Sequence, residues 1–304
     1  MYYINNILNI IVQKKFEGWG RKKTGKFAQW CQNNFGGTCT LYEDGFIRSI
    51  GLGVEGSPSY SLVEDNVGIY YDATTPSKLE NILNTYDFES DVKLMLQAQE
   101  AIALVVSHDI SKYNSAPMID DNTSRKYGFF EKEQRVLVVA QTAGDASLAY
   151  GMLQPYTTDA LIQAALLENP EAQIYVKVHP DVLNGKKSSD MDLESLDVRC
   201  IIIDDNINPL TLLKKFDKVY TKTSQMGFEA LLVGCECVCF GMPFYAGWGI
   251  TDDRTICARR QSKRSVEEVF AAAYLLYTRY YNPYEKRDCD LFEVIESIVD
   301  FRKT

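Results

Sequence analysis

Residues 135–147, RVLVVAQTAGDAS, decide the fold class because they join an apolar strand to a polar turn. The run VLVVA is apolar at every position, which is typical of a strand in a parallel sheet covered on both faces. Strand-like and helix-like segments then alternate as far as residue 241, and the later strands are AQIYVKVHP, RCIIID, KVYTKT and CECVCFG. This alternation predicts a parallel sheet with right-handed crossovers.

The length of 304 residues exceeds one ordinary core, so we expect two lobes of roughly 100–150 residues each. The predicted class is α/β with two Rossmann-like lobes. We place the first lobe at 1–134, the second at 135–255 and two closing helices at 256–304. The closing helices are SVEEVFAAAYLLYTRYYNP (265–283) and LFEVIESIVDFRK. In the first lobe, the stretch Thr75-Pro76-Ser77 opens one predicted helix and residues 89–109 form another, while polar residues 114–134 connect the lobes.

The composition excludes several classes of protein. A formal net charge of −9 argues against a dedicated nucleic-acid binder, which carries a basic surface. The opening run MYYINNILNIIVQKK lacks the cleavage pattern of a signal peptide, and no stretch reaches the ~18 uncharged apolar residues of a membrane span. We therefore expect a cytoplasmic protein with, at most, peripheral membrane contact.

The eight cysteines include no C-x-x-C pair. Cys235, Cys237 and Cys239 alternate within one predicted strand and would share one sheet face. A flat row of this kind cannot by itself provide the tetrahedral geometry of zinc, so we interpret these thiols as buried apolar side chains and predict no metal site.

Polar side chains gather where three predicted strands of the second lobe end. Ligands of open parallel sheets bind outside the carboxyl ends of the strands, so these side chains are candidate site residues. The clusters are QTAGDAS, VKVHPD and KTSQMGFEA. The candidates within them are Asp145, Lys177, His179, Pro180, Thr223, Ser224, Gly227 and Glu229.

The third cluster has the pattern of a phosphate-binding helix start. Thr223 or Ser224 would cap the helix, whose free amides can hold a phosphate. Gly227 would leave space for a nucleotide, and Glu229 could accept both hydroxyls of a ribose. A plain N-cap, with a glutamate that complements the helix dipole, is the alternative.

The two histidines have different predicted environments. His179 precedes Pro180 at a strand end, where it would project outward and could donate to a phosphate or protonate a leaving group. A structural role for His179 is the alternative. His108 ends a predicted helix, where a favourable interaction with the C-terminal end of the helix dipole explains this histidine better than a catalytic role.

Three acidic residues are candidates for catalysis. Asp145 has small neighbours that leave room for a ligand, although a helix cap is the alternative. Glu43 and Asp44 lie together in YEDGF, where a solvated loop is the alternative. If one of them faces Asp145 across a cleft, the two carboxylates form the nucleophile and acid/base pair that retaining glycosyl transfer uses.

The chain carries seven motifs in a fixed order, and some of them include the clusters described above. They are EDGFIRSIGLG, SLVEDNVGIYYDAT, SKYN, QTAGDAS, VKVHPDVLNGKK, TSQMGFEALL and GMPFYAGWGITDDR. Together they resemble the bacterial capsule β-Kdo transferases of the KpsC type, from about Gly18 to the final helices. Capsule enzymes of this type usually carry two transferase modules, whereas this sequence matches one. The segment before Gly18 does not match, so we expect the first strand there to differ or to be absent.

The resemblance implies a GT-B-like fold in which residues 1–134 face the acceptor and residues 135–255 bind CMP-Kdo. It implies no cofactor or catalytic metal, and a glycolipid or Kdo-oligosaccharide as acceptor. The motifs VKVHPDVLNGKK and TSQMGFEALL are most similar to the first module, which favours a β-2,4 linkage.

The resemblance also implies residue roles. Transfer would proceed with retention by double displacement, with Asp145 as the nucleophile. His179 and Ser224 would contact the CMP phosphate and Glu229 the ribose. For the acid/base, Glu43 is the first choice and Asp44 the second.

Two other functions remain as alternatives. A CMP-sialic acid transferase would keep the EDG and HP motifs but has no reason to carry SLVEDNVGIYYD or FYAGWG. A non-catalytic sugar-nucleotide-binding protein has no reason to hold Asp145.

A lipid-linked acceptor would bring the enzyme to the inner face of the inner membrane. The basic run Arg259, Arg260, Lys263 and Arg264 is the candidate membrane contact, and a solvated helix start is the alternative.

Overall fold

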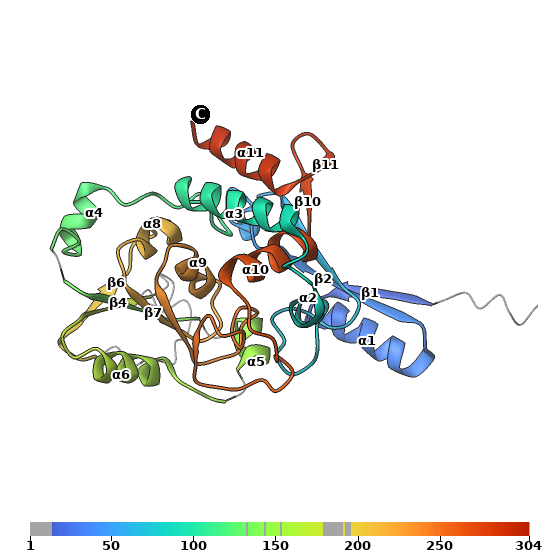
Figure 1. The fold of residues 1–304 in the computed structure, drawn as a ribbon, viewed down its shortest axis with the longest axis horizontal. Coiled ribbons are helices and arrows are strands. Elements are labelled where there is room, and N and C mark those ends of the chain that lie inside the picture. Colours follow the sequence, from blue (N-terminus) through green and yellow to red (C-terminus); the bar gives the residue numbers. More distant parts are fainter. Residues whose placement is uncertain are drawn as a thin grey trace, which may run out of the picture.

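The computed structural model of the chain describes residues 14–131, 133–142, 144–152, 154–178, 191 and 196–303. These residues form two lobes, each built on its own β-sheet, with helices around and between the sheets (Figure 1). The predicted α/β class with two lobes is confirmed. No helix within these ranges combines the length and the apolar composition that a bilayer crossing needs.

The larger sheet contains six described strands, all parallel, in the order β6-β5-β4-β7-β8-β9. Every residue of β4 (Arg135–Val139) is buried between two neighbouring strands, as its apolar sequence predicts. The other strands are β5 (Gln173–Lys177), β6 (Cys200–Ile203), β7 (Lys218–Thr221), β8 (Glu236–Cys239) and β9 (Asp252–Asp253).

Helices cover both faces of this sheet, with α6 on one side and α8 and α9 on the other (Figure 1). The described helices of the second lobe are α5 (Ala146–Gly151), α6 (Thr158–Glu168), α8 (Pro209–Leu213) and α9 (Met226–Leu232). Cys235, Cys237 and Cys239 are buried free thiols, as predicted.

The smaller sheet has the order β1-β2-β3-β10-β11. β1 and β2 pair in parallel around α1 (Lys23–Phe35), whereas the remaining pairs are antiparallel, so this lobe differs from an all-parallel Rossmann sheet. Its strands are β1 (Lys15–Trp19), β2 (Thr38–Asp44), β3 (Ser61–Asp65), β10 (Thr278–Asn282) and β11 (Arg287–Cys289). The first strand is therefore present and begins ahead of Gly18.

The C-terminal tail corrects one prediction. We expected a single helix through residues 265–283, but α10 (Val266–Phe270) and the π-helical segment η2 (Ala271–Tyr277) end where β10 begins. The residues of β10 alternate between buried and exposed, and β10 pairs with β3 of the first lobe. Threonine and tyrosine favour strands, and this pairing outweighs the helical pattern before it. The last predicted helix is confirmed as α11 (Leu291–Lys303).

The remaining helices of the first lobe follow their sequence signals. Ser77 caps α2 (Lys78–Thr85), and Asp91 caps α3 (Val92–Ser107), which ends at His108 as expected. The predicted connection at 114–134 also contains a short helix, α4 (Asp121–Lys126). The short 3-10 helix η1 (Gly53–Glu55) lies between β2 and β3.

The two lobes share one hydrophobic core. Phe46 of the first lobe lies 4.6 Å from Phe244 and 5.0 Å from Tyr274, measured between ring centroids. Phe228 of α9 lies 5.1 Å from Phe244 and 5.9 Å from Tyr274. All four rings are buried. We call these four residues the aromatic cluster, and it holds the lobes together by close packing.

The basic run is not the free cationic surface that the sequence predicts. Arg259 and Arg260 both pair with the buried carboxylate of Glu80, at 2.8 Å and 3.3 Å. Arg264 donates to the carbonyl of Leu83 at 2.7 Å. Lys263 is the one exposed member of the run. These arginines therefore link the tail to α2 instead of facing a membrane.

We predict that Glu80→Ala destabilises the protein by about 3 kcal/mol, because it leaves the side chain of Arg260, 3% exposed, without its carboxylate partner. The free energy of unfolding in urea measures this change. Glu100→Ala, an exposed glutamate on α3, is the control and should change that free energy by less than about 0.5 kcal/mol. Equal effects of the two substitutions would contradict the structural role of Glu80.

Candidate active site between the lobes

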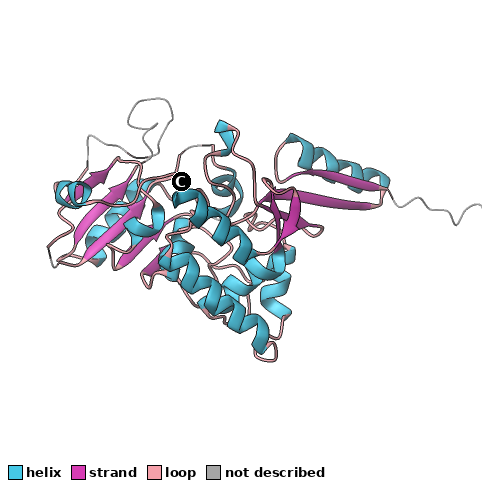
Figure 2. Cartoon of the chain, turned by 90° about the horizontal axis from the view of Figure 1, so that it is seen from above, coloured by secondary structure: helices cyan, strands magenta, loops and turns pink. Residues whose placement is uncertain are grey.

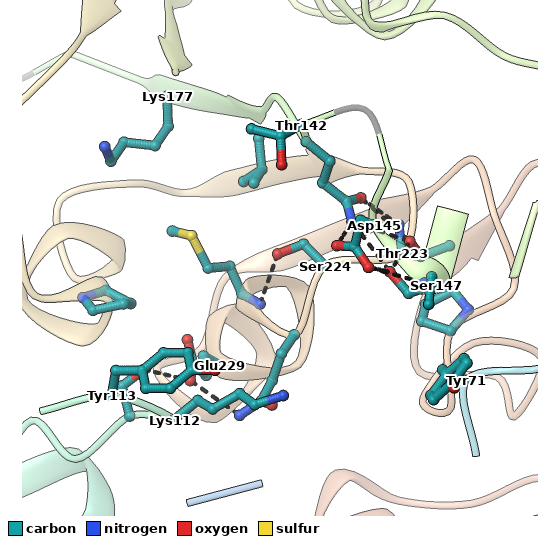
Figure 3. Close-up of a pocket in the computed structure, with 18 of the residues that line it drawn as sticks. Tyr71, Lys112, Tyr113, Thr142, Asp145, Ser147, Lys177, Thr223, Ser224 and Glu229 are labelled. Carbon is teal, nitrogen blue, oxygen red and sulfur yellow. Dashed lines mark hydrogen bonds between the residues drawn. The ribbon is translucent and has the colours of Figure 1, made fainter. Parts of the chain in front are cut away.

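A cavity of about 630 Å³ lies between the lobes, at the ends of β4, β5 and β7 (Figure 3). This volume is in the range of pockets that hold small molecules. The first lobe contributes Lys22, Glu43, Tyr70, Tyr71, Ser111, Lys112 and Tyr113 to its wall. The predicted residues that line it from the second lobe are Asp145, Lys177, Thr223, Ser224 and Glu229. Described residues of all three strand-end clusters thus meet in one cavity.

Asp145 follows β4 and is exposed to the cavity. Its Oδ1 accepts the amide and the hydroxyl of Ser147, both at 2.9 Å, so it is the N-cap of α5. Its Oδ2 accepts a longer bond of 3.3 Å from Gln141. The cap therefore orients the carboxylate, while its second oxygen is weakly held and remains accessible from the cavity.

Asp145 is held by a network of polar side chains that was not predicted from the sequence. The Gln141 side chain accepts the amide of Thr223 at 2.8 Å and donates to its Oγ1 at 3.1 Å. The hydroxyls of Thr223 and Ser147 lie 2.9 Å apart. The network joins the ends of β4 and β7, which are adjacent strands. Gln141 is the first residue of the motif QTAGDAS, and this motif is the sequence signal that could have identified it.

Glu43 and Asp44 point in different directions because adjacent residues of a strand face opposite sides of the sheet. Glu43 lines the cavity and accepts the indole N–H of Trp19 at 2.8 Å. Burial raises the pKa of the Glu43 carboxyl above its usual value. Asp44 instead forms an ion pair of 2.9 Å with Arg48 and is not part of the cavity wall.

Gly20 makes room for Glu43. It has a left-handed backbone, with φ of 36°, and a Cβ there would lie 2.7 Å from Glu43 Oε2 and 2.3 Å from the Tyr71 hydroxyl. Any larger residue would displace both groups, so this glycine is required by close approach as well as by conformation.

The residues around α9 differ in part from their predicted roles. Ser224 accepts the amide of Met226 at 3.2 Å, which leaves its hydroxyl proton available, whereas Thr223 joins the network with Gln141. Gly227 lies outside the cavity wall, and a Cβ there would lie 2.1 Å from the Tyr245 hydroxyl. The missing side chain of Gly227 therefore accommodates a buried tyrosine and not a nucleotide.

Glu229 lies at the floor of the cavity and is 2% exposed. Its carboxylate accepts hydrogen bonds from the hydroxyl of Ser111 at 2.7 Å and from the side-chain amide of Gln225 at 3.3 Å. Burial raises the pKa of Glu229. The bond to Ser111 crosses from the second lobe to the first.

Besides Lys22, two lysines bring positive charge to the cavity (Figure 3). Lys177, at the end of β5, donates to the carbonyl of Asp205 at 3.0 Å, and burial lowers its pKa. Lys112 stands in the motif SKYN. Burial by itself lowers the pKa of Lys112, but nearby tyrosines and acids outweigh this effect and raise it. No role was predicted for Lys112 from the sequence, although SKYN is one of the motifs that carry the family resemblance. His179 and Pro180 lie outside the described residues.

Comparisons with known proteins give the family. A family model for capsule polysaccharide biosynthesis proteins matches residues 18–281. The chain belongs to this family. The capsule polysaccharide modification protein LipA of Neisseria meningitidis serogroup B is 41% identical over 292 residues, 94% of this chain and 41% of LipA. The lipopolysaccharide-processing protein LpsZ of Rhizobium meliloti is 38% identical over 238 residues, 78% of this chain and 53% of LpsZ.

Two solved structures are similar along nearly the whole chain. The β-Kdo 2,4 transferase of Thermosulfurimonas dismutans KpsC is 44% identical, with a TM-score of 0.84, and the match covers 93% of this chain and 86% of that one. The β-Kdo 2,7 transferase of the same KpsC is 30% identical, with a TM-score of 0.72 and coverage of 99% and 90%. The resemblance to the capsule transferases is confirmed. The chain spans about two fifths to one half of the length of LipA and LpsZ.

We predict that Glu43 of this family member titrates at a higher pH than is usual for a glutamate, because burial disfavours its carboxylate. Trp19→Phe should raise the pKa of Glu43 further, since it removes a hydrogen bond to the charged form. Carbon-13 NMR of the side-chain carboxyls against pH measures both, with the signal assigned from its absence in Glu43→Gln. A pKa of Glu43 at or below the usual value for a glutamate would contradict the buried position.

Proposed function

We propose that the chain is a retaining glycosyltransferase that moves Kdo from CMP-Kdo to a glycolipid or Kdo-oligosaccharide acceptor. The observation that carries this proposal is the pair of carboxylates, Asp145 and Glu43, which come from different lobes and line one cavity. The similarity to two β-Kdo transferase structures supports Kdo as the transferred sugar. The higher identity and TM-score of the 2,4 transferase favour a β-2,4 linkage.

In the first step of the proposed mechanism, a carboxylate oxygen of Asp145 attacks the anomeric carbon of Kdo. The bond from this carbon to the phosphate oxygen breaks, and CMP leaves with the bonding electrons. Lys177 and the Ser224 hydroxyl line the same cavity and can stabilise the charge on the departing phosphate. By resemblance, His179 assists them. The product of this step is a Kdo ester on Asp145.

In the second step, Glu43 removes the proton of an acceptor hydroxyl, whose oxygen attacks the same carbon and releases Asp145. Two inversions give net retention. The raised pKa of Glu43 suits a group that takes up a proton and later releases it. Glu43, and not Asp44, is the proposed base because Asp44 is paired with Arg48 outside the cavity wall.

Other charged groups of the cavity fit this donor. Kdo carries a carboxylate, and Lys112 places a cation in the cavity wall. We propose that the Lys112 ammonium, whose pKa is raised by nearby tyrosines and acids, contacts the carboxylate of this sugar. Glu229 and Ser224 are proposed to hold the cytidine ribose and phosphate. No metal or cofactor is part of the proposal.

We predict that Glu43→Gln accumulates a covalent species, because the first step proceeds and the second lacks its base. Intact-mass analysis after incubation with CMP-Kdo should show one added Kdo residue, which peptide digestion maps to QTAGDAS. Asp145→Asn should show no adduct and no transfer. Asp44→Asn is the matched control and should keep most of the turnover. Substantial transfer by Asp145→Ala would exclude the covalent mechanism, and equal adduct formation from CMP-sialic acid would exclude Kdo specificity.

We predict that Ser224→Ala weakens CMP binding by about 1–3 kcal/mol, because it removes a hydrogen bond to a charged group. Isothermal titration calorimetry measures the loss, and UDP should bind the wild-type protein more weakly than CMP. Thr142→Ser, which keeps a hydroxyl in the cavity wall, serves as the control. CMP binding by Ser224→Ala that equals wild type would remove Ser224 from the phosphate site.

A further inference from the structure

The outer face of α1 presents three adjacent aromatic side chains to solvent. Phe27, Trp30 and Phe35 are 64%, 52% and 54% exposed. Phe27 stacks on Trp30 with ring centroids 5.9 Å apart, and Phe35 meets Trp30 edge-on at 5.6 Å. Single exposed apolar residues are common on protein surfaces, but a contiguous group of this kind marks an interaction site.

The opposite face of α1 explains why these rings cannot turn inward. Gly25, Ala28 and Cys31 are the buried residues of the helix, and small side chains let it pack closely on β1 and β2. The aromatic residues occupy the positions that face away from this contact. Among the described elements, none covers the outer side of α1, which lies at one end of the molecule (Figure 2).

Five lysines lie on α1 or on the chain next to it. All five are exposed, whereas the whole chain has a net charge of −9. They are Lys14, Lys15, Lys22, Lys23 and Lys26. The Lys14 ammonium lies 5.4 Å from the centroid of Phe35, so charges and rings form one surface. Glu17 is the single acidic residue between positions 14 and 35.

We propose that this α1 face, formed by Lys23, Lys26, Phe27, Trp30 and Phe35, binds the surface of an anionic lipid bilayer. Aromatic rings and lysines are the combination that helices lying in the membrane interface use. Lysines are depleted from the centres of protein–protein interfaces, so a lipid surface fits this charge better than a protein partner. The face replaces the basic run at 259–264, whose arginines are occupied within the protein.

The position of α1 relative to the cavity indicates a role for the lipid contact in presenting the acceptor. Lys22 is the N-cap of α1 and also lines the cavity between the lobes. A bilayer bound to α1 would therefore lie beside the cavity and could present a lipid-linked acceptor to it. This role in presenting the acceptor rests on the proposed function, whereas the lipid contact itself does not.

Vesicle flotation without any sugar nucleotide tests the contact. The wild-type protein should float with vesicles of phosphatidylcholine and phosphatidylglycerol, and much less with phosphatidylcholine alone. Lys23→Glu with Lys26→Glu should reduce binding about tenfold or more, and so should Phe27→Ser with Trp30→Ser. The matched controls are Lys93→Glu with Lys263→Glu, and Phe130→Ser, which change exposed residues elsewhere and should bind as wild type.

Several results would overturn the proposal. Flotation that the lysine variant or the aromatic variant leaves unchanged would remove α1 from the membrane contact. A wild-type dimer that Phe27→Ser with Trp30→Ser converts to a monomer, measured by light scattering, would assign the face to self-association. Circular dichroism verifies that the variants fold. If the aromatic variant does not fold, the lysine variant still tests the membrane contact. Because no donor is present, failure of this contact is distinguishable from failure of the transferase proposal.

Discussion

The aromatic cluster that joins the two lobes is the interaction on which the site depends. Phe46 contacts Phe244 and Tyr274 across the lobe boundary, with centroid distances of 4.6 and 5.0 Å. Buried rings pack at close to crystalline density, so the lobes cannot shift without opening voids. The separation of the cavity walls, and with it the relation of Glu43 to Asp145, follows from this packing together with the hydrogen bond between Ser111 and Glu229 at the cavity floor.

The C-terminal tail closes the same boundary from the other side. Tyr274 of η2 belongs to the aromatic cluster, and Tyr277 donates to the buried Asp65 of β3 at 2.8 Å. The strand β10 then adds to the first sheet. The chain thus begins the first lobe, builds the second and returns to complete the first. Groups buried in the cavity wall are desolvated. Burial raises the pKa values of Glu43 and Glu229 and lowers that of Lys177, and it strengthens the charges that face a ligand.

Sequence alone determined the features that depend on local pattern. The apolar run after Arg135 in β4 predicted the parallel sheet, because a strand covered on both faces consists mostly of apolar residues. The carboxyl ends of parallel strands share one edge, so Asp145, Lys177 and Ser224 could be placed in one site without coordinates. The seven motifs gave the family, since they record the same local arrangements in the same order.

Tertiary structure decided whatever depends on partners distant in the chain. Glu80 and Arg260 are separated by 180 positions, and no pattern in either segment shows that the basic run is occupied. Gly227 was predicted to admit a nucleotide, but it accommodates Tyr245. Which of Glu43 and Asp44 faces the cavity depended on the register of β2 against its neighbours. Local sequence fixes which residues alternate along a strand, whereas packing between lobes decides which face becomes the wall of the site.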